Sequence, residues 1–514
     1  MTSDTLAQPL PRPRVLADLV ARARRRLDAA TDTQLANWCE DAVWNERNRA
    51  ERRGRPPEPD IDALAAAVLR GSRADRATAA LTVLRRWSDE VHGHFDPRVH
   101  RMVTRFAPGA IDALLSSSNL RWRPDRPDHR LSVRGNTTWL AELAQEATLV
   151  VCPTHVSNLD SPLIGLALHQ AGLPPFLYGA GLNLFSNPWL GWWMHRLGAY
   201  TVDRTKKSTL YLDLLKDYAT RATARGQHGL FFPGGTRSRS GALETRTKRG
   251  LLGTAIAGWQ ESIAAGVDRE VYVVPVTFSY PLVLEANTLI QDHLAEAGRQ
   301  RFIIEDDESA APRTVLSFVR RVFDLDATVV VHFGHPVDVA GRPVSTDAVE
   351  RRADNLARRR LVSDREGRLQ ADPQRDRAYT DLVANALVDA WPRSAWATET
   401  SLAACCAIQM LGRRIGSTDP FRCLRATAAD RRLPRAALTA AIAHARAELD
   451  ASAARGMGHV DLPSEAPDLL ATALLRFARW HRSRALAADG DDILIEDPRL
   501  AIYYAARAQP FLSA

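Results

Sequence analysis

Cysteine, lysine and long apolar runs are all scarce in this chain of 514 residues. The five cysteines show no spacing typical of a metal site, so we expect small packed side chains in a reducing compartment. No run of about 18 apolar residues occurs, and we therefore expect no membrane-spanning helix. Arg12 and Arg14 are not followed by an apolar stretch, so we also expect no secretory signal.

The composition is otherwise that of a folded protein, with 45% apolar and 25% charged residues. The formal net charge of +8 comes from arginines scattered along the chain, and it suits nucleic acid, an anionic membrane or a phosphorylated substrate. The lysines are not scattered, because all of them lie between Arg204 and Gly250: Lys206, Lys207, Lys216 and Lys248. This stretch concentrates cations where we expect a phosphate.

Three regions are predicted from the pattern of apolar residues. Residues 1–125 and 346–514 show helical spacing, while strands and helices alternate over 126–345, which is typical of an α/β domain. The expected strands are 147–152, 176–178, 198–202, 229–232, 271–278 and 328–333. The expected helices are 61–69, 77–87, 161–171, 210–224, 250–263, 349–361, 376–391, 401–414, 438–454 and 466–484.

The stretch Thr154–Asp160 follows the first expected strand and precedes a helix. His155 at such a turn faces outward from rigid elements, and a carboxylate at Asp160 can fold back to fix the tautomer of its ring. His155 is therefore a candidate general base with Asp160 as its orienting group. The alternative is structural: Ser157 caps the helix and Asp160 is favoured by the helix dipole.

Two further stretches carry cations at expected strand ends. In Gly229–Gly241, two glycines precede Arg237 and Arg239, whose guanidinium groups match a phosphate, and Lys248 extends this site. A solvated basic loop is the alternative. Gly198–Arg204 ends at the same expected edge of the sheet, so Arg204 is expected to converge with His155 and Arg237. Asp203 is equally compatible with a plain surface ion pair to Arg204.

Pro275 lies inside the expected strand 271–278 and requires either a bulge or a missing ladder partner, although a simple core strand is as plausible. Bulky apolar residues crowd the segment from Leu184 to Met194, including Phe185, Trp189, Trp192 and Trp193. Tryptophan favours membrane interfaces, so this segment indicates a membrane contact or an acyl tunnel. The alternative is that these side chains fill the core.

In their order and spacing, four blocks resemble the glycerolipid acyltransferase family: His155-x4-Asp160, Gly198–Arg204, Phe232–Ser238 and Val274-Pro275. The resemblance covers roughly residue 130 to the end. The long glycerol-3-phosphate and dihydroxyacetone-phosphate branch is most similar, on Gly179–Phe185, Arg196–Ala199, Arg237–Gly241, Thr400–Ala404 and Tyr503-Tyr504. The implied fold is an α/β acyltransferase-type mixed sheet flanked by helices, with helical N-terminal and C-terminal regions.

The resemblance also implies roles for residues at matching positions. His155 would deprotonate an acceptor hydroxyl with Asp160 as orienter, and the alkoxide would attack the thioester of acyl-CoA or acyl carrier protein, in glycerophospholipid biosynthesis. No metal and no cofactor would be needed. The acceptor phosphate would contact Arg204, Arg237, Arg239 and Lys248. The acceptor and oxyanion loop would be Gly234, Gly235, Thr236 and Ser238. Acyl or membrane contacts would come from Phe185, Trp189, Trp192, Trp193 and Pro275.

Two positions depart from the family pattern. Gly234 stands where the family has a glutamate, and Asp203 stands where the long branch often has an arginine. Because both changes fall on the acceptor side, we hypothesise retained acyl transfer with an altered acceptor, such as a lysophospholipid or a molecule without phosphate.

A catalytically silent acyl-thioester or lipid-binding homologue is the main alternative class. We expect peripheral binding at the cytoplasmic side of a membrane. No motif supports a nucleic-acid partner or a serine hydrolase.

Overall fold

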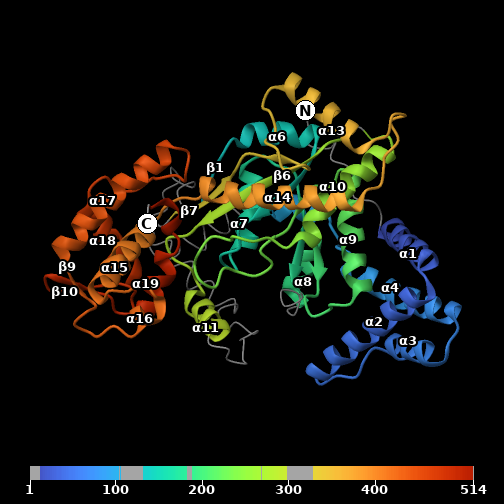
Figure 1. Cartoon of the computed structure of the whole chain (residues 1–514), viewed down its shortest axis with the longest axis horizontal. Coiled ribbons are helices and arrows are strands. Elements are labelled where there is room, and N and C mark those ends of the chain that lie inside the picture. Colours follow the sequence, from blue (N-terminus) through green and yellow to red (C-terminus); the bar gives the residue numbers. More distant parts are fainter. Residues whose placement is uncertain are drawn as a thin grey trace.

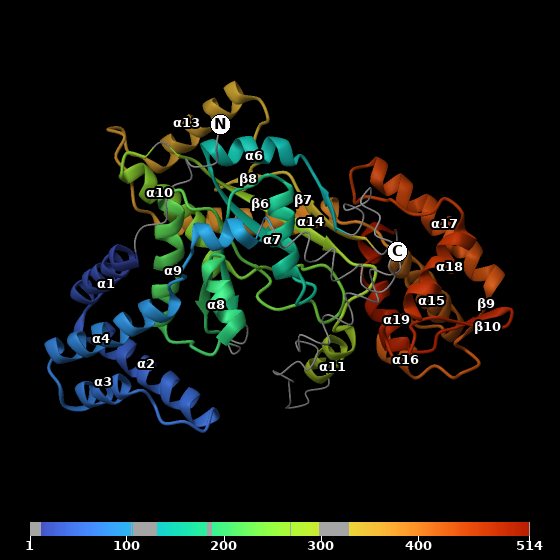
Figure 2. The same ribbon diagram turned by 180° about the vertical axis from the view of Figure 1, so that it is seen from behind.

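The computed structural model describes residues 12–103, 105, 131–181, 188–267, 269–297 and 328–512, without the side chains of residues 188–190, 296 and 297. Two helical regions lie at opposite ends of an α/β unit (Figures 1 and 2). The predicted fold class, a mixed sheet flanked by helices with a helical region at each end, is therefore confirmed. The domain boundaries remain predictions.

The N-terminal region contains α1 (Arg12–Ala29), α2 (Asp32–Arg52), α3 (Pro59–Arg70) and α4 (Arg73–Val91). The predicted break at Gly71-Ser72 is confirmed, because α3 ends there and the Ser72 hydroxyl caps α4 by accepting from the Asp75 N–H. These helices pack through Trp87 and their leucines onto α9 (Thr209–Ala224), so the region is attached to the α/β unit by a shared apolar core.

The main sheet has the order β1-β7-β6-β2-β5-β3-β4, with β8 paired to β6. Its strands are β1 (Leu131–Arg134), β2 (Thr148–Pro153), β3 (Leu177–Gly181), β4 (Ala199–Val202), β5 (Gly229–Leu230), β6 (Val271–Ser279), β7 (Val329–Phe333) and β8 (Val337–Asp338). Strands β6, β2, β5, β3 and β4 are parallel, so their carboxyl ends meet at one edge. Strands β7 and β8 pair antiparallel with β6, and β1 pairs parallel with β7.

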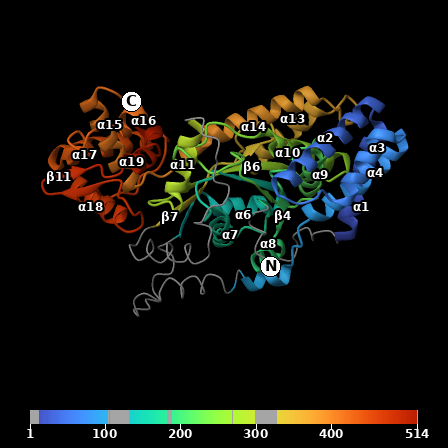
Figure 3. The same ribbon diagram turned by 90° about the horizontal axis from the view of Figure 1, so that it is seen from below.

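Both faces of the sheet are covered, which explains the continuously apolar strands. Along β2, Leu149 and Val151 face the core beneath α6 (Thr137–Glu146) and α7 (Asp160–Gln170). Val150 and Cys152 face the opposite core, beneath α10 (Arg249–Ala264) and α14 (Pro373–Ser394). Figure 3 shows these helices as two layers, with α13 (Ala348–Val362) beside α14. The site at the end of β2 is thus held by a strand buried on both sides.

Pro275 sits in β6 without a bulge, because its pairing with Cys152 continues the register of the β2–β6 ladder. Its other side faces the gap between β8, which ends its pairing at Val273, and β7, which begins at Val276. The Pro275 carbonyl accepts from Gly334 at 2.8 Å in that gap. A missing ladder partner is therefore the correct explanation, as one alternative from the sequence proposed.

Most predicted elements occur within a few residues of their expected bounds, and two are shorter than expected. The strand predicted to reach Phe232 ends at Leu230, and the helix predicted over 466–484 ends at Phe477. The segment Gly179–Gly181, expected to follow a strand, is part of β3. Helices α1 and α2 lie in the region expected to be helical, although neither was predicted individually. Other elements outside the specific predictions are β1, β8, α6, α8 (Pro188–Arg196) and α11 (Ala286–Ala297), with β9 (Arg432–Pro434), β10 (Ala487–Asp489), β11 (Asp492–Leu494), α16 (Pro420–Leu424) and α19 (Pro498–Ala505) in the C-terminal region.

The C-terminal region contains α15 (Glu399–Ile415), α17 (Arg435–Ala454) and α18 (Ala466–Phe477) packed around α19 and a small antiparallel sheet. Its last helix docks on the α/β unit, where the Tyr504 hydroxyl accepts from the Val283 N–H at 3.1 Å. Gly241 has a φ of +82° and lies against the Tyr503 carbonyl, 2.0 Å from where a Cβ would stand. A glycine is thus required at this contact.

We expect Gly241→Ala to lower the thermal midpoint strongly, since its Cβ would strike the Tyr503 carbonyl. The matched control is Gly266→Ala, with a φ of +70° and open space around it. The control isolates the cost of the left-handed conformation, about 1–2 kcal/mol. Gly241→Ala should cost roughly 1–3 kcal/mol more through overpacking. Equal losses in thermal denaturation would contradict the packing of α19 on this loop.

Candidate active site

The turn after β2 brings His155 and Asp160 together. The Nδ1 atom of His155 lies 2.8 Å from Asp160 Oδ2, and the same oxygen accepts from the N–H groups of Val156 at 2.6 Å and Ser157 at 2.9 Å. A carboxylate in this position accepts a hydrogen bond from Nδ1–H, which keeps the proton on Nδ1 and leaves Nε2 free to accept another. The predicted pair therefore has the geometry of a general base with its orienting group.

Asp160 is fully buried, and its second oxygen is held from β6. The Tyr280 hydroxyl donates to Asp160 Oδ1 at 2.6 Å. Burial and the neighbouring Asp160 charge raise the pKa of Tyr280 well above its ordinary value, so this hydroxyl keeps its proton and acts as the donor. Four donors thus compensate the loss of water around a buried carboxylate.

The capping role considered for Ser157 is not found. The residue before the first helical residue is Leu159, which makes no side-chain cap. The Ser157 hydroxyl instead donates to Glu285 Oε2 at 3.0 Å, and the fully buried Glu285 accepts from Arg237 Nη1 at 2.8 Å through its other oxygen. Ser157 therefore links the His155 turn to the predicted phosphate-binding arginine, by way of a carboxylate that sequence reasoning missed.

The imidazole of His155 stacks on Phe232, with ring centroids 4.2 Å apart and an interplanar angle of 27°. Its side chain is 12% exposed, so the ring is packed on one side and still reaches solvent. Phe232 follows β5, the parallel neighbour of β2. The expected convergence at the carboxyl edge of the sheet thus holds for these two stretches.

Arg204 and Arg237 are close enough to influence each other. Partial desolvation, followed by the charge of Arg237, lowers the pKa of Arg204, whose side chain stays exposed. Two guanidinium groups in one field favour an anion between them. Arg239 is turned toward α11, with its Nε atom 3.7 Å from Asp292 Oδ2.

Lys248 folds over the glycine turn. Its backbone N–H donates to the Pro233 carbonyl at 2.7 Å, and its side chain crosses Gly235 so closely that a Cβ there would lie 2.6 Å from Nζ. Gly235 also has a φ of +79°, so both its conformation and this contact call for glycine. The exposed ammonium of Lys248 therefore borders the loop that carries Arg237.

Two of the loop amides considered for an oxyanion already have acceptors. Gly235 N–H donates to Phe232 O at 3.1 Å, and Ser238 N–H donates to His155 O at 2.8 Å. The Ser238 hydroxyl donates to Ala242 O at 2.6 Å, while Thr236 is exposed. Ser238 thus braces the loop against the His155 turn, and the oxyanion donors remain a prediction.

The space beside Gly234 is filled by a carboxyl group from the same loop. A Cβ at Gly234 would lie 3.1 Å from Glu244 Cγ and 3.3 Å from its Oε1. That oxygen accepts from the His155 N–H at 2.6 Å. Sequence reasoning missed Glu244, although it is the sole acidic residue between Gly229 and Arg249. Gly234 itself carries no carboxylate, and Glu244 places one beside it.

Asp203 does not pair with Arg204 and does not face the acceptor arginines. Its carboxylate accepts from Arg49 Nη2 of α2 at 2.8 Å and from the Thr205 N–H at 2.9 Å. Lys206, three residues on, is buried and pairs with Glu90 of α4. The N-terminal helices thus hold the loop that carries Arg204. The negative charge of Asp203 is neutralised by its ion pair with Arg49.

The apolar residues expected at a membrane or acyl chain are only partly described. Phe185 and the side chain of Trp189 lie outside the described residues. Trp192 is 45% exposed beneath the Arg196 guanidinium, 3.9 Å from the ring centroid, and Trp193 is half-buried. Pro275 is buried in β6 and has no access to a membrane surface, contrary to one prediction. Within the described residues, no helix combines the length and apolarity that crossing a membrane requires.

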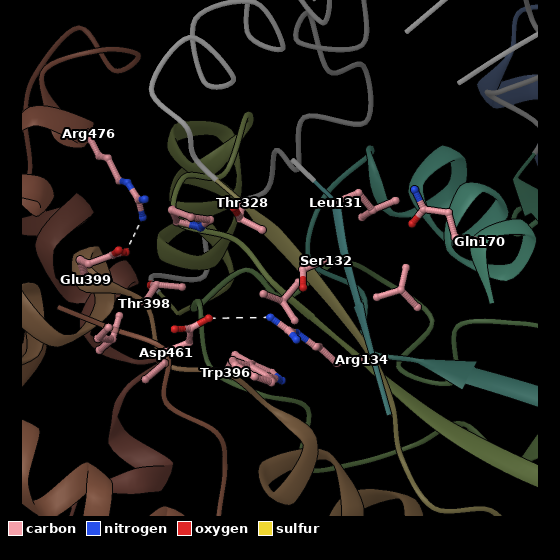
Figure 4. Close-up of a pocket in the computed structure, with 15 residues that line it drawn as sticks. Leu131, Ser132, Arg134, Gln170, Thr328, Trp396, Thr398, Glu399, Asp461 and Arg476 are labelled. Carbon is pink, nitrogen blue, oxygen red and sulfur yellow. Dashed lines mark hydrogen bonds and ion pairs between the residues drawn. The ribbon is translucent and has the colours of Figure 1, made fainter. Parts of the chain in front are cut away.

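A cavity of about 660 Å³ opens elsewhere, between β1 and the C-terminal region (Figure 4). Its lining contains none of the predicted site residues. Its charged groups are paired with one another, Arg134 with Asp461 at 3.8 Å and Arg476 with Glu399. The cavity is therefore separate from the His155 site.

A family model matches the part of the chain that carries this site. Residues 135–279, which include His155, Arg204 and Arg237, match the family model described as Acyltransferase. The stretch that carries the candidate site is therefore similar to this acyltransferase family.

Two curated relatives make the comparison more specific, and both are glycerol-3-phosphate acyltransferases. The protein of Aeromonas hydrophila is 34% identical over 177 residues, which cover 34% of this chain and 21% of the relative. The protein of Pseudoalteromonas translucida is 26% identical over 205 residues, or 40% of this chain and 23% of the relative. The chain thus spans about a fifth of the length of these relatives. A solved 1-acyl-sn-glycerophosphate acyltransferase of Thermotoga maritima aligns with 69% of this chain and 93% of its own, at 15% identity and a TM-score of 0.27.

A double-mutant cycle tests how the N-terminal helices hold the Arg204 loop. We expect Arg49→Ala and Asp203→Ala to show a coupling of about 0.5–3 kcal/mol in denaturant unfolding, since the side chains are only 17% and 6% exposed. The exposed pair Arg47 and Asp62, at 3.4 Å, is the matched control and should show no measurable coupling.

The same coupling should depend on pH. Burial would raise the pKa of Asp203, but hydrogen bonds from Thr205 and the charges of Arg49 and Arg53 outweigh it and hold the pKa below its ordinary value. A lowered pKa in the folded state gives stability that is present above the unfolded value, about 3.9, and is lost as pH falls below it. A coupling that persists unchanged at lower pH would contradict this assignment.

Proposed function

We propose that the protein is an O-acyltransferase that moves a fatty acyl group from acyl-CoA or acyl carrier protein to a hydroxyl of glycerol 3-phosphate. The observation that carries this proposal is the 2.8 Å contact between His155 Nδ1 and the buried Asp160 carboxylate, in a turn that Ser157 and Glu285 link to Arg237. The family of the α/β unit and the names of its relatives support it.

The reaction proceeds through one proton carrier and no acyl-enzyme. His155 Nε2 accepts the proton of the acceptor hydroxyl while that oxygen attacks the thioester carbonyl. The tetrahedral intermediate breaks its C–S bond, forms the ester, and the leaving thiolate takes the proton back from the imidazolium. Asp160 stabilises the imidazolium and holds the ring in the tautomer that accepts at Nε2.

Glycerol 3-phosphate is favoured as acceptor because both departures from the family pattern have local partners. The charge of Asp203 is held by Arg49, and Glu244 supplies a carboxyl group beside Gly234. Neither change requires the altered acceptor that the sequence led us to hypothesise. Arg204, Arg237 and the ammonium of Lys248 then hold the acceptor phosphate.

Peripheral association with the cytoplasmic side of a membrane is part of the proposal. The exposed Trp192, stacked beneath Arg196, offers an aromatic and a cationic group together, which suits an anionic lipid interface. The acylated product is poorly soluble in water, so an enzyme at a membrane surface can release it directly into the bilayer.

The general base is tested by His155→Ala. We expect kcat to fall about 10²–10⁴-fold, because the acceptor hydroxyl loses its proton acceptor. His169→Ala, which removes an exposed histidine of α7, is the matched control and should leave kcat unchanged. The measurement is release of free thiol from acyl-CoA in the presence of glycerol 3-phosphate. Undiminished turnover in His155→Ala would refute His155 as the general base. A wild-type protein that shows no turnover with any acceptor would support the alternative of a catalytically silent lipid-binding homologue.

The acceptor is tested by Arg204→Ala. We expect the KM for glycerol 3-phosphate to rise about 10–100-fold with kcat largely kept, since a charged contact to phosphate is lost. Arg246→Ala, at an exposed arginine of the loop that carries Arg237, is the control and should change KM little. Equal use of glycerol, or preference for a lysophospholipid, in the parent protein would contradict glycerol 3-phosphate as the acceptor.

A further inference from the structure

One acidic side chain beside the catalytic pair has no part in the transfer described above. We propose that Glu244 is a positioning residue that fixes His155 for proton transfer by accepting a hydrogen bond from its backbone N–H. The inference rests on the proposed function, because it concerns the imidazole that acts there as general base.

The geometry assigns this role directly. Glu244 Oε1 lies 2.6 Å from the His155 backbone nitrogen, within the range of a short charge-assisted hydrogen bond. The side chain reaches that position by passing over Gly234, where a Cβ would lie 3.1 Å from Glu244 Cγ. Gly234 does not have a positive φ. Its lack of a side chain therefore matters for the space it leaves to Glu244 and not for its backbone conformation.

Both backbone polar groups of His155 are held by the same loop. Its N–H donates to Glu244, and its carbonyl accepts from the Ser238 N–H at 2.8 Å. Asp160 holds the other end of the residue through the ring. His155 is thus held at three points, and Glu244 supplies the side-chain contact to its backbone.

The surroundings of Glu244 make its charge sensitive to pH. The groups that face it are Asp160 of α7, Arg507 beyond α19 and His155 itself, with Lys248 on the far side of Gly235. Burial, with a contribution from Asp160, raises the pKa of Glu244 to about 7, although the His155 N–H and Arg507 oppose the shift. The hydrogen bond to His155 is therefore strengthened by ionisation as pH rises through neutrality.

The experiment compares Glu244→Ala and Glu244→Gln with Thr245→Ala, an exposed neighbour, after wild-type turnover and the loss in His155→Ala have been established. We expect Glu244→Ala to lower kcat about 10–100-fold with little change in KM, because the base is misplaced while the acceptor arginines stay. Glu244→Gln keeps an acceptor oxygen and should recover kcat to within about fivefold of wild type.

A pH profile separates positioning from a merely structural role. Loss of the negative charge in Glu244→Gln disfavours the protonated imidazole nearby, so the pH of half-maximal kcat should move toward acid. A rise in KM with kcat unchanged, or a Gln variant as impaired as the Ala variant, would overturn the proposal. So would equal losses in Thr245→Ala.

Hydrogen exchange gives a readout that does not require turnover. In Glu244→Ala, the amide of His155 loses its acceptor, and peptides covering the turn after β2 should exchange faster than in wild type or Thr245→Ala. Unchanged exchange overturns the proposal even if the protein transfers no acyl group. If wild type shows no acyl transfer but Glu244→Ala still exchanges faster, the contact between Glu244 and His155 is supported and the proposed function is refuted.

Discussion

The structure depends on the buried carboxylate of Asp160 and the donors that surround it. A charge without water is costly unless hydrogen bonds replace its hydration, and here the His155 ring, two backbone N–H groups and the Tyr280 hydroxyl do so. These donors come from the turn after β2 and from the end of β6. The orientation of the imidazole is thereby tied to the packing of two central strands.

The helical regions at the two ends of the chain serve the same edge of the sheet. From the N-terminal side, Arg49 and Glu90 grip the loop around Arg204 through Asp203 and Lys206. From the C-terminal side, Tyr503 and Tyr504 support the segments that carry Gly241 and Val283. The loops of the candidate site are therefore held from outside the α/β unit, which gives residues before β1 a structural role that their sequence did not show.

The His155–Asp160 pair was predictable because the two residues are five positions apart and lie between a strand and a helix, so local structure alone brings them together. Glu244, at 89 positions from His155, was not predictable, because its place follows from the close parallel pairing of β2 and β5 and from the room at Gly234. The same holds for the partner of Asp203, which lies 154 positions away in α2. The sequence shows where charged residues lie along the chain. It does not show which distant residues they pair with, because the fold determines that.

The contact of α19 with the β6 segment joins residues 221 positions apart, Val283 and Tyr504. Contacts between residues so far apart in sequence form late in folding, because closing a long loop has an entropy cost that the contact alone does not offset. During synthesis on a ribosome, the loop at Gly241 therefore lacks its final support until α19 has emerged. Most of the sheet can be buried before that moment, so the loop at Gly241 reaches its final packing only after the bulk of the fold.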